Sequence, residues 1–268
     1  MLNTETMRAV DLNADLAEGE VLSPGDLGVL DAVTSASLAC GFHAGDPDLM
    51  RTTAAACVAR GVVIGAHVSY RDREGFGRRA MDVPPEVLVD DIVDQWETLA
   101  AQVGAVGTEI AFVKPHGALY HRMGVDPTVA DSVVEAVRRV GGVMLVAQAG
   151  TVVVGPARRA GLRVVPEGFP DRAYLADGRL ASRREPGALI DDPEVVGRRA
   201  LSLAREGGVE AVDGRWTAVE VETLCLHGDS PGAADAARTV RAALEGAGIV
   251  VRAFAEGRGP DPGLPPDP

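Results

Sequence analysis

The sequence has almost no lysine. Lys114 is the only one among the 268 residues, and every other basic residue is an arginine. A chain that uses arginine everywhere else keeps a lysine where a planar guanidinium cannot replace a compact ammonium. Lys114 therefore marks a candidate site that needs a small positive charge with a movable pKa.

Basic surface is also scarce, since the formal net charge is −13. Nucleic acids and anionic membranes bind proteins through basic patches, so neither is expected as a partner. No apolar run is long enough to span a bilayer. Residues 1–8 lack the charged and apolar regions of a signal peptide, and the expected location is the cytoplasm.

Cysteines and aromatic residues are few. Three cysteines are an odd number, and without a C-x-x-C pair they predict neither a disulfide framework nor a cysteine zinc site. Cys40 precedes a glycine in a loop, where a nucleophile is one interpretation and a small buried thiol is the favoured one. Aromatic residues make up 4%, so the core is mostly Val, Leu and Ala, as in buried parallel sheets.

Segments that read as strands alternate with helical patterns seven or eight times. This order predicts a parallel sheet with helices outside it. Without a dinucleotide-binding fingerprint or an evident switch point, we predict that the sheet closes into a (β/α) barrel. One barrel domain is expected over residues 1–255, followed by a disordered Pro/Gly-rich tail over 256–268. The predicted strands are residues 10–16, 34–39, 62–66, 110–113, 143–147, 164–165 and 219–226, with 249–253 as a further candidate.

The predicted helices lie between these strands. Asp46 followed by Pro47 is a strong helix start, because Asp caps the first turn and proline fits the first helical position. Gly19 and Pro24 are read as loop residues, and Gly117 as part of a turn. The helical patterns cover residues 47–60, 84–103, 127–140, 151–160, 193–205 and 233–245.

Ionisable and polar side chains follow the predicted strands. In a parallel barrel the carboxyl ends of the strands share one mouth, where active groups gather. Converging ionisable groups shift one another's pKa and can do acid–base chemistry near neutral pH. The strand-end residues are His43, His67, Lys114, His116, Gln148, Glu167 and His227.

Two further features concern the histidines and the first strand. His121 lies past the turn that follows Lys114 and is expected to be solvated. Asp11, Asn13 and Asp15 share one face of the first strand. Three polar residues on one face of an internal strand are costly to bury unless they are paired or functional.

A metal and an anion are both possible ligands of this mouth. Asp15, His43 and His67 would suit a divalent ion such as Mg, Mn or Zn, although no H-E-x-x-H spacing is present. Loop arginines could clamp a carboxylate or a phosphate. The phosphate-binding pattern G-x-x-x-x-G-K-[ST] is absent, so a nucleotide would be held in another way or on another subunit. The loop arginines are Arg78, Arg79, Arg172 and Arg183.

Seven short segments, taken together, resemble the LamB/YcsF family and occur in the family's order over about residues 11–249. The departures remove no charged or histidine position: Ala14, Ala17, Ser37 and Val68 stand where the family usually has cysteine, glycine, asparagine and proline. The segments are residues 11–16 (DLNADL), 39–47 (ACGFHAGDP), 65–70 (GAHVSY), 75–79 (GFGRR), 114–120 (KPHGALY), 167–174 (EGFPDRAY) and 227–229 (HGD).

The resemblance implies a (β/α) barrel of the glycoside hydrolase/deacetylase type with seven main strands. It implies the ATP-dependent opening of 5-oxo-L-proline to L-glutamate, by a family whose members act as the A component of a 5-oxoprolinase with partner subunits B and C. A five-membered lactam is a poor electrophile, and phosphorylating its carbonyl oxygen would give an imidate that water can attack. The small-molecule substrate is thus expected in the barrel mouth, and a homo-oligomer is also possible.

On this hypothesis Lys114 and an arginine meet the substrate carboxylate or the phosphoryl charge. A carboxylate, Asp15 or Glu167, or else a histidine serves as the base for water, and the histidines polarise the carbonyl or hold a metal. The candidate catalytic residues are Asp15, His43, His67, Lys114, His116, Glu167 and His227. The candidate substrate-binding residues are Asn13, Arg78, Arg79, Arg172 and Asp229.

Two other functions remain open at this point. One is a metal-dependent deacetylase that acts alone on an N-acyl sugar, for which bound metal and activity without ATP would be evidence. The other is a binding protein that presents substrate to a catalytic partner, for which tolerance of the loss of every strand-end histidine would be evidence.

Overall fold

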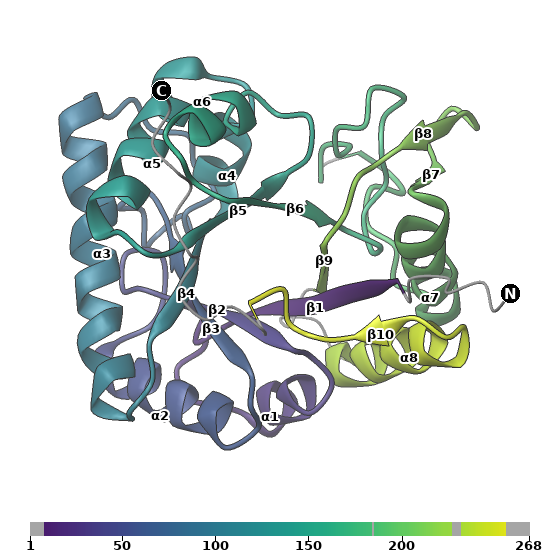
Figure 1. Ribbon diagram of the computed structural model, residues 1–268, viewed down its shortest axis with the longest axis horizontal. Helices are drawn as coiled ribbons and strands as arrows, with labels where there is room; N and C mark the ends of the chain where they lie inside the picture. Colours follow the sequence, from purple (N-terminus) through teal and green to yellow (C-terminus); the bar gives the residue numbers. More distant parts are fainter. Residues whose placement is uncertain (1–7, 184, 227–231, 256–268) are drawn as a thin grey trace, which may run out of the picture.

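Seven parallel strands form a closed ring with helices outside it (Figure 1). The computed structural model describes residues 8–183, 185–226 and 232–255. The ring runs β1-β2-β3-β4-β5-β6-β9 and closes through the pairing of β1 with β9, so the predicted (β/α) barrel is confirmed. The strands of the ring are β1 (Ala9–Leu16), β2 (Ser35–Ala39), β3 (Val63–Val68), β4 (Ile110–Pro115), β5 (Met144–Gln148), β6 (Val164–Gly168) and β9 (Thr223–Leu226).

The helices cover the outside of the ring and begin at the predicted kinds of residue. Asp46 caps its helix by accepting from the backbone N–H groups of Asp48 and Leu49, as expected. Asp126 and Asp192 cap two later helices in the same way, each with proline next. The helices are α1 (Pro24–Leu30), α2 (Pro47–Val58), α3 (Pro85–Ala105), α4 (Gly117–Met123), α5 (Pro127–Val140), α6 (Val154–Arg159), α7 (Pro193–Leu201) and α8 (Ala233–Gly246).

Some local predictions were wrong. Pro24 is not a loop residue but the first residue of α1, because the Ser23 hydroxyl accepts from the Asp26 N–H and the Asp26 carboxylate accepts from the Ser23 N–H. Gly117 is likewise not a simple turn, since α4 starts there directly after β4. The last strand of the ring starts at Thr223, later than predicted.

Several short elements lie outside the ring. A small antiparallel hairpin, β7 (Gly208–Glu210) and β8 (Trp216–Ala218), precedes β9 and was not predicted. A π-helical turn, η1 (Ser202–Glu206), continues α7. The candidate last strand exists as β10 (Val250–Val251), which pairs with β1 beside Ala9. The expected disordered tail lies outside the described residues.

The barrel interior has an apolar floor. Phe112, Val146 and Val165 form a cluster of their own, and the ring of Phe254 packs on Phe112 with the centroids 5.1 Å apart. Gly65 leaves the space that the Phe112 ring occupies, because a Cβ there would lie 2.1 Å from a ring carbon. Polar side chains on the same faces of the strands therefore gather above this floor, towards the carboxyl ends.

The segment between β6 and α7 has little regular structure but is well tied. Isolated bridges join Arg172 to Leu189 and Tyr174 to Leu180. The backbone N–H of Phe169 donates to the Tyr174 hydroxyl at 2.7 Å, and Arg199 donates to the carbonyl of Arg172 at 2.7 Å. Within the described ranges, no helix combines the length and the apolar character needed to cross a membrane.

Candidate active site

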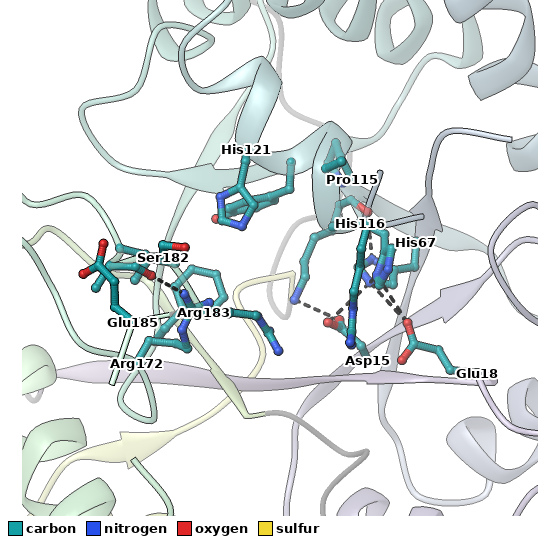
Figure 2. A pocket seen from close by; sticks show the side chains of 18 of the residues that line it. Asp15, Glu18, His67, Pro115, His116, His121, Arg172, Ser182, Arg183 and Glu185 are labelled. Atoms are coloured by element: carbon teal, nitrogen blue, oxygen red, sulfur yellow. Dashed lines mark hydrogen bonds and ion pairs between the residues drawn. The ribbon is translucent and has the colours of Figure 1, made fainter. Parts of the chain in front are cut away.

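A cavity of about 700 Å³ opens at the carboxyl ends of the strands. Its lining divides into two groups on opposite sides, which Figure 2 shows facing each other. The histidine side consists of Asp15, Glu18, His67 and His116, with His43 buried behind them. The arginine side consists of Arg172, Ser182, Arg183 and Glu185.

Lys114 lies at the base of the histidine side and is 2% exposed. Its ammonium is 2.8 Å from Glu167 Oε1 and 2.9 Å from Asp15 Oδ1. It also donates to Asn13 Oδ1 at 2.8 Å and contacts Cys225 Sγ at 3.2 Å. The Asp15 contact has the distance but not the orientation of a hydrogen bond, so it is an ion pair only.

These contacts decide the charge of the group. Burial alone would lower the pKa of Lys114, but the carboxylates of Asp15 and Glu167 outweigh it and raise that pKa well above its usual value. Burial likewise opposes ionisation of Asp15, yet the charges of His67 and Lys114 hold its pKa well below the usual range. Lys114 is thus a cation that holds two carboxylates in place, not a neutral base.

The polar face of β1 is fully paired beneath this lysine. Asn13 donates to Glu167 at 3.1 Å and to the Thr223 hydroxyl at 2.7 Å. The Thr223 hydroxyl in turn donates to the Asp11 carboxylate, which also accepts from Ser35 at 2.8 Å. The expectation that these buried polar residues are paired is confirmed, and the pairing forms one chain from Asp11 to Lys114.

Three imidazoles pack tightly on the histidine side. The rings of His43 and His116 are stacked, with centroids 4.0 Å apart and an interplanar angle of 4°, and His67 stands nearly perpendicular to both. His67 Nε2 lies 2.9 Å from His116 Nδ1 and 3.3 Å from Asp15 Oδ2. Gly77 packs against this group, and a Cβ there would lie 2.8 Å from a ring carbon of His116.

Glu18 completes the histidine side and was missed by sequence reasoning. Its Oε1 lies 3.1 Å from His43 Nε2, 3.3 Å from His116 Nδ1 and 3.8 Å from His67 Nε2. Ala17 precedes it with a φ of 61°, a conformation that glycine adopts at no steric cost. A glycine at this position in the resembling family was the available signal, because it indicates a chain reversal that aims residue 18 back at the mouth.

The pKa values of the histidines differ sharply. Burial and the charge of His67 lower the pKa of His43 to about 2 and that of His116 to about 3. Burial also opposes protonation of His67, but the carboxylates of Asp15 and Glu18 raise its pKa above the usual value. In the absence of a bound cation, one imidazolium at His67 therefore faces two neutral imidazoles.

The arginine side is built on the segment between β6 and α7. Arg172 is 2% exposed and donates to the carbonyl of Ala181 at 2.7 Å, while its Nε has no hydrogen-bond partner. Among the described residues, no carboxylate forms an ion pair with it. Burial and the nearby charge of Arg183 lower its pKa. A buried guanidinium without a paired anion favours an anionic ligand.

The other predicted arginines are placed differently. Arg78 lines the cavity, with its guanidinium 5.0 Å from the centre of the Phe76 ring. Arg79 points away and forms a close ion pair with the buried carboxylate of Asp72. The structure therefore brings Arg78, Arg172 and Arg183 to the cavity and not Arg79.

Tyr120 and His121 of α4 border the cavity between the two sides. The Tyr120 hydroxyl and Glu167 Oε2 are buried without a well-formed hydrogen bond. Burial and the charge of Glu167 raise the pKa of Tyr120 well above its usual value. His121 is exposed, as predicted, but it lines the cavity, where partial desolvation and the charges of Arg172 and Arg183 lower its pKa.

The remaining candidates can be placed briefly. Gln148 is buried at the end of β5 and donates to the carbonyl of Gly178 at 2.6 Å. All three cysteines are buried and free, and burial raises the pKa of the Cys40 thiol to about 12. This supports the buried-thiol interpretation. The predicted sites at His227 and Asp229 lie outside the described residues.

The cavity unites acid–base groups, a cluster that could bind a metal, and a buried arginine. Glu18, His43, His67 and His116 each offer one ligand atom, and these four atoms all lie within 4.8 Å of one another. A parallel barrel with such a mouth defines a class of barrel proteins whose chemistry takes place at the strand ends. The comparisons with known proteins identify the family within that class.

The chain belongs to the LamB/YcsF family, whose model matches residues 10–259. It is 50% identical over 249 residues to a Streptomyces coelicolor protein named as the A component of 5-oxoprolinase, covering 92% of this chain and 100% of that one. It is 47% identical over 252 residues to a Pseudomonas syringae pv. tomato protein that carries the same name with the number 3, covering 93% and 98%.

Solved structures agree with this assignment. The lactam utilization protein of Thermus thermophilus superposes with a TM-score of 0.87 at 46% identity, over 92% of this chain and 100% of that one. A peptidoglycan deacetylase of Bacillus subtilis, at 11% identity and a TM-score of 0.51 over 94% and 90%, shares the fold alone. The family resemblance and the deacetylase-type barrel are thus confirmed.

Proposed function

We propose that this chain opens the lactam ring of 5-oxo-L-proline to give L-glutamate, coupled to ATP hydrolysis, as the A component of an assembly with subunits B and C. The observation that carries the proposal is the two-sided cavity in a chain that matches proteins named as this component of 5-oxoprolinase over more than nine-tenths of its length. A neighbour named for lactam utilization adds support.

The substrate has two polar ends that fit the two sides of the cavity. Its carboxylate would pair with Arg172, the buried guanidinium that has no carboxylate partner among the described residues. Its lactam carbonyl would then face the histidine side. Asp15 is better placed than Glu167 to act as a base for water, because Asp15 lines the cavity and Glu167 lies beneath it.

The chemistry needs ATP because the lactam carbonyl is unreactive. Transfer of the terminal phosphoryl group to the carbonyl oxygen gives ADP and an activated imidate. Water adds to its carbon, the C–N bond breaks as the nitrogen takes a proton, and the resulting acyl phosphate is hydrolysed by a second water to glutamate and phosphate. Lys114 would keep Asp15 and Glu167 ionised and in position during these steps.

The test is glutamate release from 5-oxoproline, with and without ATP, by the chain alone and mixed with candidate B and C subunits. We expect turnover only in the complete mixture with ATP. Absence of glutamate from an otherwise competent mixture would contradict the proposal. Hydrolysis of an N-acyl sugar by the chain alone, without ATP, would favour the deacetylase alternative, which the histidine–carboxylate cluster also suits.

A further inference from the structure

We propose that Glu18, His43, His67 and His116 bind one divalent transition-metal ion at the wall of the cavity. The ligand atoms are Glu18 Oε1, His43 Nε2, His67 Nε2 and His116 Nδ1, which come from four different strand-end segments. This set keeps two of the three ligands expected from the sequence. Glu18 and His116 take the place of Asp15, whose carboxylate is held by Lys114.

The outer nitrogens of the three imidazoles fix which nitrogen carries the proton. His67 Nδ1 is 3.0 Å from the carbonyl oxygen of Lys114, and His116 Nε2 is 2.9 Å from that of Phe76. A carbonyl only accepts, so both of these nitrogens are N–H donors. The lone pairs of His67 Nε2 and His116 Nδ1 therefore point into the cluster.

The third imidazole is held in the same manner through a hydroxyl. The Ser69 hydroxyl donates its own proton to the carbonyl of Tyr70 at 2.9 Å, so its oxygen accepts from His43 Nδ1 at 3.0 Å. His43 Nε2 is thus also a lone-pair donor aimed at Glu18. Imidazoles whose outer N–H is bound to a carbonyl or hydroxyl are the arrangement that orients metal ligands in proteins.

Four electron-pair donors consequently face one another at short range. The contact between His67 Nε2 and His116 Nδ1 is 2.9 Å, and Glu18 Oε1 is 3.1 Å from His43 Nε2 and 3.3 Å from His116 Nδ1. One added proton can make one of these contacts attractive but not all of them. A single cation among the four atoms makes every contact attractive at once.

The donor set also indicates the kind of ion. Three imidazoles and one carboxylate suit Zn²⁺, Mn²⁺ or a related first-row ion, whereas Mg²⁺ prefers oxygen ligands and retains water. Atoms on opposite sides of one ion at about 2.2 Å are about 4.4 Å apart, so the observed limit of 4.8 Å needs only a small closure. Because Glu18, His67 and His116 line the cavity, an open position on the ion would face the substrate.

The experiment measures metal binding to the full chain, prepared without a histidine tag and stripped with a chelator. Zn²⁺, Mn²⁺ and Co²⁺ are titrated separately, bound metal is measured after gel filtration, and melting is followed with and without each ion. We expect one equivalent per chain for at least one ion, a metal-dependent rise in melting temperature, and no displacement by millimolar Mg²⁺.

Three variants make the result specific. Ser69→Ala, which removes only the support of His43, should weaken binding about 10- to 100-fold, and Glu18→Gln, which removes a ligand with little change of shape, should weaken it more. His121→Gln, at the cavity but outside the cluster, should bind like the wild type. Metal-free melting curves of the variants verify that each is folded.

The proposal is overturned if the folded wild-type chain binds only a small fraction of an equivalent of every ion. It is equally overturned if Glu18→Gln binds metal as tightly as the wild type. Neither result depends on turnover of 5-oxoproline, so this proposal and the proposed function fail separately.

Discussion

The two sides of the cavity are built by opposite means. On the histidine side, sheet register places His67 beside Lys114 in paired strands, and a buried hydrogen-bond chain supports them from below. On the arginine side, Arg172 stands in a segment with little regular structure, fixed by two isolated bridges and by contacts from α7. One side is fixed by the barrel itself and the other by an insertion above it.

This difference separates two tasks. The histidine side holds several charges of both signs within a few ångströms, so its geometry has to be rigid and its contacts are mutually compensating. The arginine side presents a buried cation without a carboxylate partner among the described residues, which leaves it open to an anion. We infer that reaction chemistry belongs to the first side and recognition of the substrate carboxylate to the second.

The largest effect should follow from Lys114→Met, which tests whether the histidine side is held by compensating charge. Removing the ammonium leaves Asp15 and Glu167 buried without their cation, and the free energy of unfolding should fall by about 3–5 kcal/mol. Urea unfolding at neutral pH measures it. Arg51→Gln, which breaks the exposed pair of Arg51 with Asp48, is the control and should change stability little.

A double variant distinguishes lost charge compensation from lost packing. Adding Glu167→Gln to Lys114→Met removes one of the uncompensated charges, so part of the lost stability should return. If the double variant is no more stable than Lys114→Met, the lysine contributes mainly through its packed side chain, and the charge-based account of this side is wrong.

How far the sequence predicts the site follows the same division. Period-two patterns and strand ends predicted His67, Lys114 and Glu167 at one mouth, because parallel strands bring their carboxyl ends together whatever the loops do. Glu18 could not be reached in this way, since it lies past the strand and its direction depends on the φ of Ala17. The sequence indicates a loop there but not where the loop points.

The arginines show the limit more clearly. The sequence offered Arg79 and Arg172 as equivalent loop arginines, and only tertiary contacts separate them. Arg79 is bound to the carboxylate of Asp72, whereas Arg172 is buried against the cavity. No local pattern contains that difference, because the partners come from the folding of a whole loop.

A smaller effect should appear in the support beneath the histidine side. Burial raises the pKa of Asp11 to about 6 in the folded chain, although hydroxyl donors from Thr223, Thr34 and Ser35 oppose it. The folded state then binds more protons than the unfolded state between about pH 4 and pH 6, so this carboxyl makes stability fall as pH rises through that window. The loss is at most about 3 kcal/mol.

Asp11→Asn isolates this contribution. Urea unfolding from pH 4 to pH 7 should show a stability difference between wild type and variant that shifts in favour of the variant as pH rises, and then becomes constant. Parallel curves across the whole range would mean that Asp11 does not change its protonation there, and that the chain from Asp11 to Lys114 carries no strained charge.

The last prediction concerns the arginine side and rests on the proposed function. Arg172→Lys keeps a positive charge but loses the fork that pairs with a carboxylate, and hydrogen bonds to a charged group contribute about 1.5–3 kcal/mol. In the assembled complex, KM for 5-oxoproline should rise by about 10- to 150-fold with a much smaller change in kcat. Arg79→Lys, whose side chain faces Asp72 instead of the cavity, should leave KM unchanged. A fall in kcat at constant KM would place Arg172 with the reacting groups and would remove the division of tasks between the two sides.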